Sequence, residues 1–241
     1  MVISMALFTI GCVPAKKMVY FQELESIKVN DSVVNYEPEI QVGDLLTINV
    51  SALDNEAVTP FNLVENSGSR NAMVVRYLVN IDGELNFPVI GKLKAEGLTS
   101  KQLNALLVKR LSVYIQNPIV NIRLVNFKIS VLGEVREPGS FPIPNERVSI
   151  LEAISLAGDL TIQGKRNNVL LVREEKGKRV FVNIDLTNKA LFNSPYYYLA
   201  QNDVLYVTPN KAKINASSGF NIGTILGIVS TLISITLLLT R

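Results

Sequence analysis

Alternating apolar and polar positions predict strands in two stretches of the first half of the chain. Residues 42–53, VGDLLTINVSAL, alternate after a Gly-Asp turn, which is the period of a half-buried strand. Residues 74–97 predict a hairpin, with Asp82-Gly83 at its turn and Pro88 limiting its second arm. The intervening residues 57–72 are rich in Asn, Ser, Gly and Pro, and they predict a long loop.

A helical period follows the hairpin. Leucines three and four residues apart in 98–115 predict one amphipathic helix, with Thr99 or Ser100 as its N-cap. Asn117-Pro118 ends the helix, and alternation returns from residue 119. One strand-rich unit therefore closes near residue 127.

The residues after 127 show the same kinds of pattern and predict a second unit. Residues 128–143 predict two strands joined by a turn, and Ser149 is the predicted N-cap of a helix that stops at Gly158. Residues 168–186 then predict a hairpin, and 199–209 predict a last strand. This order indicates a small α+β unit in which one helix covers a curled sheet.

The carboxyl end is a continuous apolar stretch. Residues 219–240 would form about 33 Å of helix at 1.5 Å per residue, enough to cross the hydrocarbon of a bilayer. We therefore predict a transmembrane helix there.

This predicted helix is two-sided, because 100° of rotation per residue gathers small and hydroxylic residues on one face. They are Gly223, Thr224, Gly227, Ser230, Thr231 and Ser234. Two interpretations stay open: helices packing closely through the glycine pair, or hydroxyls lining a wet lumen inside a ring of helices.

The amino end carries a shorter apolar run. Residues 2–11 contain no charge and end at Gly11, immediately before Cys12, the chain's one cysteine. Ten residues are too few to span a bilayer. Residues 1–12 resemble a bacterial lipoprotein signal, which implies a lipidated Cys12 as the first mature residue, although no Lys or Arg precedes the run. The alternative is an incidental apolar cysteine at a frayed terminus.

The amino-acid composition excludes several classes of catalytic and metal-binding site. The 241 residues contain no histidine and one cysteine, which excludes Ser-His-Asp and Cys-His nucleophile systems, ordinary structural zinc sites and an internal disulfide. The net charge of +3 comes from cations scattered among acids, so we expect no nucleic-acid partner. We expect no metal, no cofactor and no catalytic residue.

Two carboxylate pairs, Asp82 with Glu84 and Glu174 with Glu175, have the residue type used in glycoside hydrolysis. They sit at predicted hairpin turns, so we interpret them as solvated turn residues. The tyrosines at 196–198 could stack on sugar rings, but consecutive residues of a strand point to opposite faces, so at most two share a surface.

Taken in order, these segments resemble the outer-membrane polysaccharide export proteins of capsule and exopolysaccharide systems, the Wza-like translocons. The resemblance runs from about residue 36 to 209. It rests on VNIDGELNFPVIGKLKAEGLTSKQL and NPIVNIRLV in the first unit, and on VLGEVREPGSFPI and SILEAISLAGDLT in the second. We interpret the turn residues of these phrases as structural: Gly83, Pro88, Gly91, Gly133, Pro138, Gly139 and Gly158.

The resemblance implies an α+β fold with an export domain at 36–127, a β-grasp-like SLBB domain at 128–209, and then the transmembrane helix. It further implies a lipid-anchored homo-oligomeric ring, an octamer, in the outer membrane. Its globular domains would lie in the periplasm and pass polysaccharide outward, next to an inner-membrane polysaccharide co-polymerase or tyrosine kinase. The alternative is a membrane-tethered sugar-binding or scaffolding module without a pore of its own. The best-known members carry two SLBB units, whereas this chain has room for one.

Overall fold

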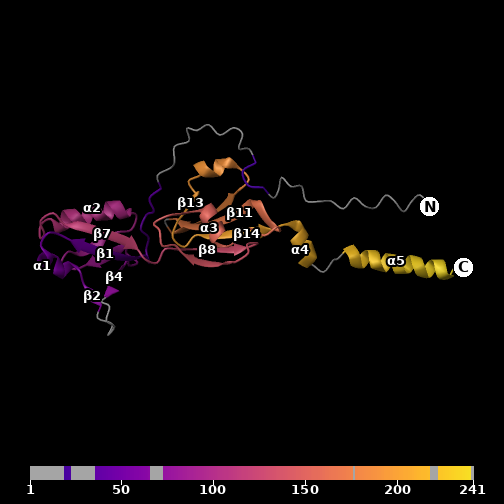
Figure 1. Ribbon diagram of the computed structural model, residues 1–241, viewed down its shortest axis with the longest axis horizontal. Coiled ribbons are helices and arrows are strands. Elements are labelled where there is room, and N and C mark those ends of the chain that lie inside the picture. Colours follow the sequence, from indigo (N-terminus) through magenta and orange to yellow (C-terminus); the bar gives the residue numbers. More distant parts are fainter. Residues whose placement is uncertain (1–18, 23–35, 66–72, 176, 218–221, 240–241) are drawn as a thin grey trace.

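The computed structural model describes residues 19–22, 36–65, 73–175, 177–217 and 222–239, and Figure 1 shows them as two neighbouring α+β domains followed by two helices. Each domain has its own cluster of buried hydrophobic side chains. The mixed helix-and-strand fold predicted from the sequence is confirmed in this respect.

The first domain is built on a three-stranded antiparallel sheet. Its middle strand β1 (Leu45–Ser51) pairs with β4 (Arg76–Leu78) on one side and β7 (Ile119–Leu124) on the other. Alternate β1 side chains are buried, as the period-two pattern predicted. Helix α2 (Ser100–Leu111) packs on this sheet through three fully buried leucines, Leu103, Leu107 and Leu111.

The start of α2 is confirmed at Thr99. Its side chain accepts a hydrogen bond from the Gln102 amide, and the Gln102 side chain accepts one from the Thr99 amide. This reciprocal pair satisfies two amide groups that the helix itself leaves without partners.

Two predictions in the first domain need correction. The predicted second arm, β5 (Glu84–Phe87), ends before Pro88 as expected, but it pairs with β6 (Gly91–Lys94) across the turn at residues 88–91, whereas β4 pairs with β1, so the predicted pairing across Asp82-Gly83 is wrong. Proline has no amide hydrogen to donate, and Gly91 takes the left-handed φ of +82° on the far side of the turn.

The predicted loop at 57–72 holds regular structure at its beginning: the end of α1 (Asn55–Val58), a 3-10 helix (Thr59–Phe61) and β2 (Val64–Glu65), which pairs with β3 (Met73–Val74). Asp54 caps α1 by accepting hydrogen bonds from the Glu56 and Ala57 amides. Because the composition of residues 57–72 is typical of turns, the sequence did not predict this short capped helix.

The second domain is a five-stranded sheet in the order β12-β11-β14-β8-β9. The strands are β8 (Lys128–Gly133), β9 (Gly139–Pro142), β11 (Gly164–Glu175), β12 (Lys178–Ile184) and β14 (Val204–Pro209). The last strand, β14, inserts beside the first, β8, and runs parallel to it, while the other pairs are antiparallel.

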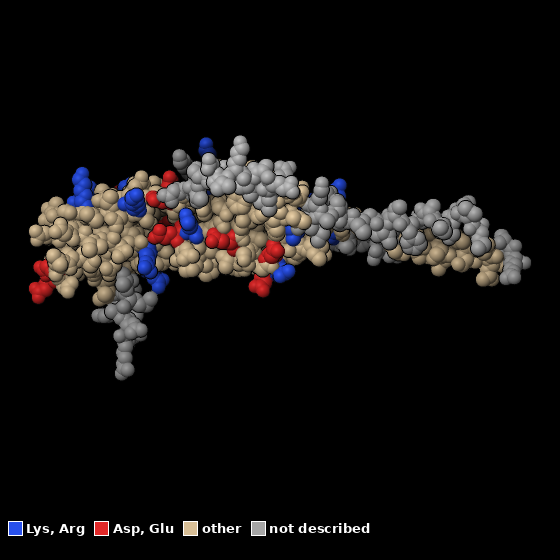
Figure 2. Space-filling view, turned by 45° about the horizontal axis from the view of Figure 1, so that its top comes forward, with Lys and Arg blue, Asp and Glu red and all other residues tan. Residues whose placement is uncertain are grey.

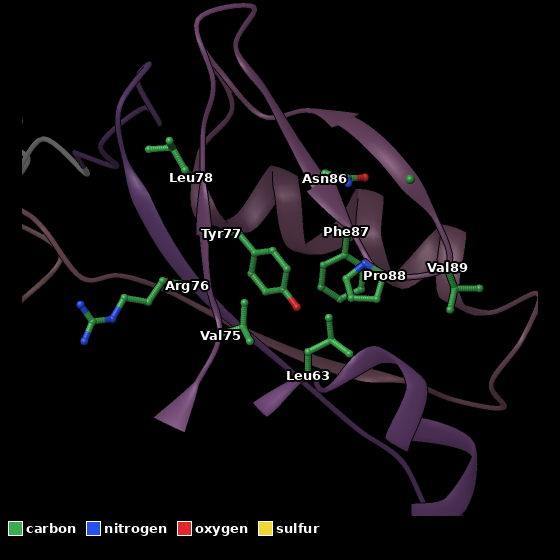
Figure 3. Close-up of a pocket in the computed structure, with 10 residues that line it drawn as sticks. Leu63, Val75, Arg76, Tyr77, Leu78, Asn86, Phe87, Pro88 and Val89 are labelled. Atoms are coloured by element: carbon green, nitrogen blue, oxygen red, sulfur yellow. The ribbon is translucent and has the colours of Figure 1, made fainter. Parts of the chain in front are cut away.

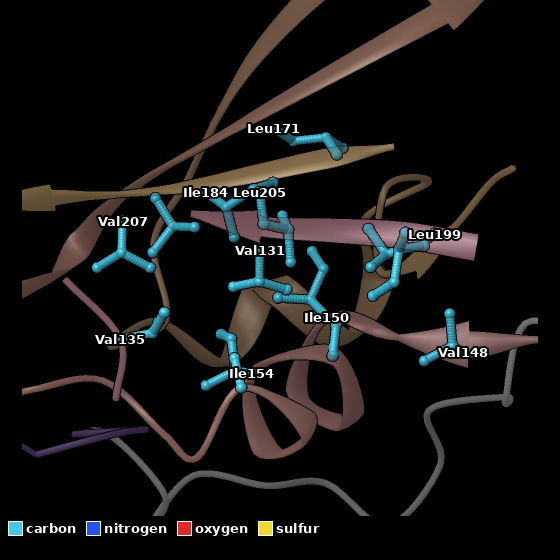
Figure 4. Close-up of a cluster of buried hydrophobic side chains, with 14 of the residues drawn as sticks. Val131, Val135, Val148, Ile150, Ile154, Leu171, Ile184, Leu199, Leu205 and Val207 are labelled. Carbon is cyan, nitrogen blue, oxygen red and sulfur yellow. The ribbon is translucent and has the colours of Figure 1, made fainter. Parts of the chain in front are cut away.

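Helix α3 (Ile150–Leu156) covers one face of this sheet. It begins at the predicted N-cap Ser149, which forms a capping box with Glu152, and Gly158 follows it in the left-handed conformation. Figure 4 shows Ile150 and Ile154 of α3 facing Val131 and Leu205 of the sheet. A short ladder of β10 (Val148–Ser149) with β13 (Tyr198–Leu199) lies at the helix start.

Helices α4 (Lys211–Ser217) and α5 (Ile222–Leu239) follow β14. Within the part of the chain that the structure describes, no helix has the length and hydropathy needed to cross a membrane. The transmembrane helix predicted over 219–240 is therefore not supported.

Candidate functional site

The residues expected to line a pore or pack helices lie on α5. Gly223, Gly227, Ser230, Thr231 and Ser234 are exposed in the single chain, and the space beside Gly227 is open. The backbone of Thr224 belongs to α5, but its side chain lies outside the described part, as does Cys12 altogether.

The hydroxyls on this face of α5 are already hydrogen-bonded. Ser230 and Thr231 each donate to the Gly227 carbonyl at 2.9 Å, and Ser234 donates to the Ser230 carbonyl at 2.9 Å. Such bonds to the preceding turn satisfy a hydroxyl in an apolar setting. The face therefore needs no water to satisfy these three groups.

The two carboxylate pairs lie at strand ends beside turns: Asp82 is in a turn, Glu84 begins β5, and Glu174 and Glu175 end β11. Asp82 is exposed, and Glu84 lies 3.7 Å from the Lys92 ammonium. Glu174 is exposed and Glu175 lies 3.7 Å from the Arg173 guanidinium. Neither pair lines one of the cavities described below, so the geometry does not present them to a substrate.

The largest of these cavities, about 1360 Å³, lies between the two domains. Its walls come from the segment before the first domain, the start of α2, the connection between the domains, and the loop between β9 and β10. Polar and charged groups on these walls are Glu37, Lys101, Arg123, Asn145, Glu146, Arg147 and Glu152. Figure 2 shows cations and acids interspersed near the junction of the domains rather than gathered into one patch. We call this cavity the interdomain cleft.

A second cavity, of about 520 Å³, belongs to the first domain alone. Tyr77 on β4 and Phe87 on β5 form its floor, with ring centroids 5.2 Å apart. Figure 3 shows the Tyr77 hydroxyl pointing into the space between Leu63 and Pro88. Burial raises the pKa of the Tyr77 phenol, so it stays protonated and can donate a hydrogen bond at neutral pH. The walls carry polar and apolar surface in nearly equal shares.

A buried ion pair fixes the tyrosine segment of the second domain. Arg173 Nη2 lies 2.7 Å from Asp203 Oδ2, and its Nε donates to both carboxylate oxygens at 3.0 and 3.1 Å. The same Nη2 donates to the Tyr198 carbonyl at 2.9 Å. The Asp203 carboxylate also accepts a bond from the Ala200 amide. Strand β13 is therefore tied to the central sheet through charge-assisted bonds.

The three consecutive tyrosines divide between two environments. Tyr197 and Tyr198 contact each other edge to face at 5.0 Å, whereas the Tyr196 ring lies under the Arg173 guanidinium at 5.3 Å. Two of the three rings thus share a surface, but they are consecutive residues, which strand alternation did not predict; of the three tyrosines only Tyr198 belongs to β13.

Comparison with known proteins decides which family these domains represent. Residues 32–125 match the family model described as polysaccharide biosynthesis/export protein, and residues 127–207 match the SLBB domain. The first domain is therefore similar to the polysaccharide biosynthesis/export family, and the second is similar to the SLBB domain. The interdomain cleft lies where these two matched domains meet.

Two curated relatives share the printed name EPS I polysaccharide export outer membrane protein EpsA. The protein from Ralstonia solanacearum is 26% identical over 162 residues, covering 61% of this chain and 42% of the relative. The protein from Ralstonia nicotianae is 27% identical over 104 residues, covering 42% of this chain and 27% of the relative. The chain therefore spans less than half the length of the curated relatives it matches.

Sequence reasoning missed the interdomain cleft and the Arg173–Asp203 pair. The cleft joins residues from four separated segments, which no local pattern connects. One feature of the sequence points to the Arg173–Asp203 pair. Arg173 occupies a buried position of the alternating strand β11, where a charged side chain needs a partner. The partner itself, Asp203, could not be chosen from the sequence, because several other acids were equally available.

Proposed function

We propose that this protein is a subunit of an outer-membrane assembly that exports capsular polysaccharide or exopolysaccharide. One observation carries the proposal: an export domain and an SLBB domain follow each other in one chain whose curated relatives are named polysaccharide export outer membrane proteins. The family role is transport, so we assign no covalent step to the protein. We further propose residues 36–127 and 128–209 as the two functional domains.

In this proposal the working unit is a homo-oligomeric ring, an octamer as the family resemblance implies. Contacts between unlike surfaces of neighbouring copies close into a ring when the rotation between copies divides a full turn. The pore is then a property of the assembly. The globular domains would lie in the periplasm, with an inner-membrane polysaccharide co-polymerase or tyrosine kinase as the partner that delivers the polymer.

The exposed apolar surface of α5 supports assembly. Isolated in the single chain, α5 leaves Leu232 58% exposed and Leu238 81% exposed. A contiguous apolar surface of this kind marks a site of contact with protein or lipid. Of the two interpretations of the small-residue face, we favour close packing of helices through Gly223 and Gly227, because the hydroxyls beside them are satisfied within the helix.

Lipid attachment at Cys12 is the membrane anchor in the proposal. Buried acyl chains contribute about 0.8 kcal/mol per methylene, so several chains anchor firmly where one chain is marginal. The lipid on Cys12 would hold each subunit to the membrane, and α5 would contact neighbouring subunits. Incorporation of radioactive palmitate into the wild type and its loss in Cys12→Ser tests this part alone.

A second candidate function is a membrane-tethered sugar-binding or scaffolding module without its own pore. The observation that favours it is that both hydrophobic cores are complete within one chain. A protein of this kind folds without neighbours and needs no ring.

Deletion of the gene from its natural host, with and without complementation, tests the proposed function. We expect the deletion strain to lose extracellular polysaccharide and to accumulate polymer in the periplasm, and the wild-type chain to restore export. A strain that makes and exports normal amounts of polymer without this protein would contradict the proposal. Reduced polymer synthesis with no periplasmic accumulation would favour the scaffolding module instead.

A further inference from the structure

Six aromatic rings contact one another in linear order on the second domain. Consecutive ring centroids lie 6.0, 5.1, 5.4, 5.0 and 5.3 Å apart. We call this set the aromatic row; in spatial order it consists of Tyr20, Phe21, Phe192, Tyr197, Tyr198 and Tyr36.

The row is assembled from segments far apart in the sequence. Phe192 comes from the 3-10 helix Lys189–Asn193, and Tyr197 and Tyr198 come from the segment at β13. Tyr20 and Phe21 precede the first domain in the chain, and Tyr36 lies at its start. Backbone bonds hold one of these ends in place: the Phe21 amide donates to the Leu186 carbonyl at 3.4 Å, and the Gln22 amide donates to the Thr187 carbonyl at 3.0 Å.

None of the six rings is fully buried, although all lie against a well-packed domain. Phe192, in the middle of the row, is 40% exposed. A ring placed for core stability alone is normally covered on all sides, because that maximises the apolar area removed from water. The row therefore keeps aromatic surface available to a ligand.

Hydrogen-bonding groups stand at both ends of the row. At one end the Arg166 guanidinium lies 5.2 Å from the Tyr20 ring centroid, and the Tyr20 hydroxyl donates to the Asp159 carboxylate. At the other end the Arg147 guanidinium lies 5.4 Å from the Tyr198 ring centroid. Arg166 is buried and its Nε has no hydrogen-bond partner.

The row also reaches the interdomain cleft, since Tyr36 of the row lines the cleft and Arg147 on the cleft wall lies over the Tyr198 ring. Beyond them, Glu37, Asn145 and Glu152 line the cleft with carboxylate and amide groups. Carboxylates, amides and guanidinium groups are the side chains that pair with neighbouring hydroxyls. Stacking surface and hydroxyl-binding surface are therefore continuous.

We propose that the aromatic row and the interdomain cleft form one binding track for a glycan chain. The exposed aromatic surface of the row receives the polarised C–H groups of successive sugar rings, and the cleft receives their hydroxyls. Stacking on an aromatic ring depends little on which unit of the polymer is stacked. A polymer can therefore move along the row without being held at one position. This inference rests on the proposed export function for its ligand.

Nucleic-acid bases also stack on aromatic rows, but that use requires cations along the phosphate backbone. Here the cleft walls carry as many acids as cations: Glu37, Glu146 and Glu152 against Lys101, Arg123 and Arg147. A glycan, which needs no such neutralisation, fits this balance better.

The absence of tryptophan from the chain permits a site-specific test. Phe192→Trp places one fluorescent reporter in the row, and Phe181→Trp places one on the edge strand β12, where Phe181 is 66% exposed and outside the row. Both full-length variants are titrated with oligosaccharides made by partial hydrolysis of the host's own extracellular polysaccharide. We expect a saturable blue shift for Phe192→Trp and none for Phe181→Trp. No shift in either variant, or the same shift in both, would overturn the track.

Export measured in the deletion strain separates this inference from the proposed function. Complementation with Phe192→Ala should lower extracellular polysaccharide several-fold, whereas Phe181→Ala should restore it fully, at equal protein levels and unchanged melting temperatures. If the wild-type chain restores export and Phe192→Ala restores it equally well, the track is wrong and the export function stands. If the deletion does not affect export, both ideas fail.

Discussion

Asp44 is a carboxylic acid with no exposed surface in the first domain. One carboxylate oxygen accepts a bond from the Gln41 amide at 2.8 Å, and the other has no hydrogen-bond partner. Burial raises the pKa of Asp44 from 3.8 to about 6. The folded state therefore binds a proton more tightly than the unfolded chain does, and stability falls as the pH rises from about 4 through 6.

Replacing Asp44 by Asn should remove this pH dependence. The amide keeps an oxygen for the Gln41 bond and carries no charge to bury. We expect Asp44→Asn to be more stable than the wild type by about 1–3 kcal/mol at pH 8, and about equally stable at pH 4. Urea unfolding at both pH values measures the difference. A wild type that is the more stable protein at pH 8 would show that the carboxylate is satisfied by a contact not described above.

Gly133 differs from other left-handed glycines because of what lies beside it. Its φ is +89°, and an added Cβ would overlap the backbone carbonyl of Val207 on β14. Gly177 has a φ of +73° with open space around it, which makes it a matched control. We expect both alanine variants to lose about 1–2 kcal/mol for the backbone conformation. Gly133→Ala should lose about 1–3 kcal/mol more, because the β8–β14 pairing must shift.

Thermal and chemical unfolding of the two variants checks this difference. Equal losses in Gly133→Ala and Gly177→Ala would mean that β14 can move away at no cost. The result also bears on the sequence interpretation, which assigned Gly133 a structural role but could not name the neighbouring strand.

The glycine and proline turns could be interpreted from the sequence because their cause is local backbone geometry. The raised pKa of Asp44 and the pairing of Arg173 with Asp203 could not be predicted from the sequence. Each depends on a buried environment that distant segments form together. Hydrophobic pattern marks Arg173 as buried but does not select its partner.

At the level of elements, capped helices and alternating strands were predicted most accurately. Thr99 and Ser149 are the observed N-caps of α2 and α3. Elements that break a simple pattern were missed: β5 pairs with β6 and not with the strand before Asp82-Gly83, and α1 sits in a segment with the composition of a loop. The parallel insertion of β14 beside β8 follows from packing over the α3 core, and it has no signal in the local sequence.

Helix α5 provides the element-level prediction about assembly. Gly227→Leu adds bulk to the small-residue face, where no neighbouring atom of the same chain blocks it. If subunits pack through this face, the variant should separate into smaller species and export less polysaccharide. Val229→Phe adds bulk to the opposite face and serves as the control. Equal behaviour of the two variants in native mass and export would contradict packing through Gly227.

At the level of the whole molecule, the chain returns on itself. Residues 19–22 precede the first domain in sequence, yet they pack on the second domain, where Tyr20 and Phe21 contact its core. Helices α4 and α5 continue from the same domain. In the proposed assembly the second domain is therefore the one next to the membrane, and the first domain extends toward the inner-membrane partner.

The sequence could predict two domains in series, because each has its own cycle of strands and one main helix. It could not predict the contact of the amino-terminal segment with the second domain, since Tyr20 and Phe21 have no periodic context. The track proposed above depends on that contact, and so it emerged only from the three-dimensional arrangement.

Native mass of the full-length protein extracted from the cell envelope tests the central claim most directly. Light scattering with the detergent contribution removed gives the protein mass, which we compare with the 26.6 kDa of one chain. We expect a closed ring, whose mass is a fixed multiple near eight subunits and does not change on dilution. A monomer that persists in mild detergents would contradict a channel formed by assembly.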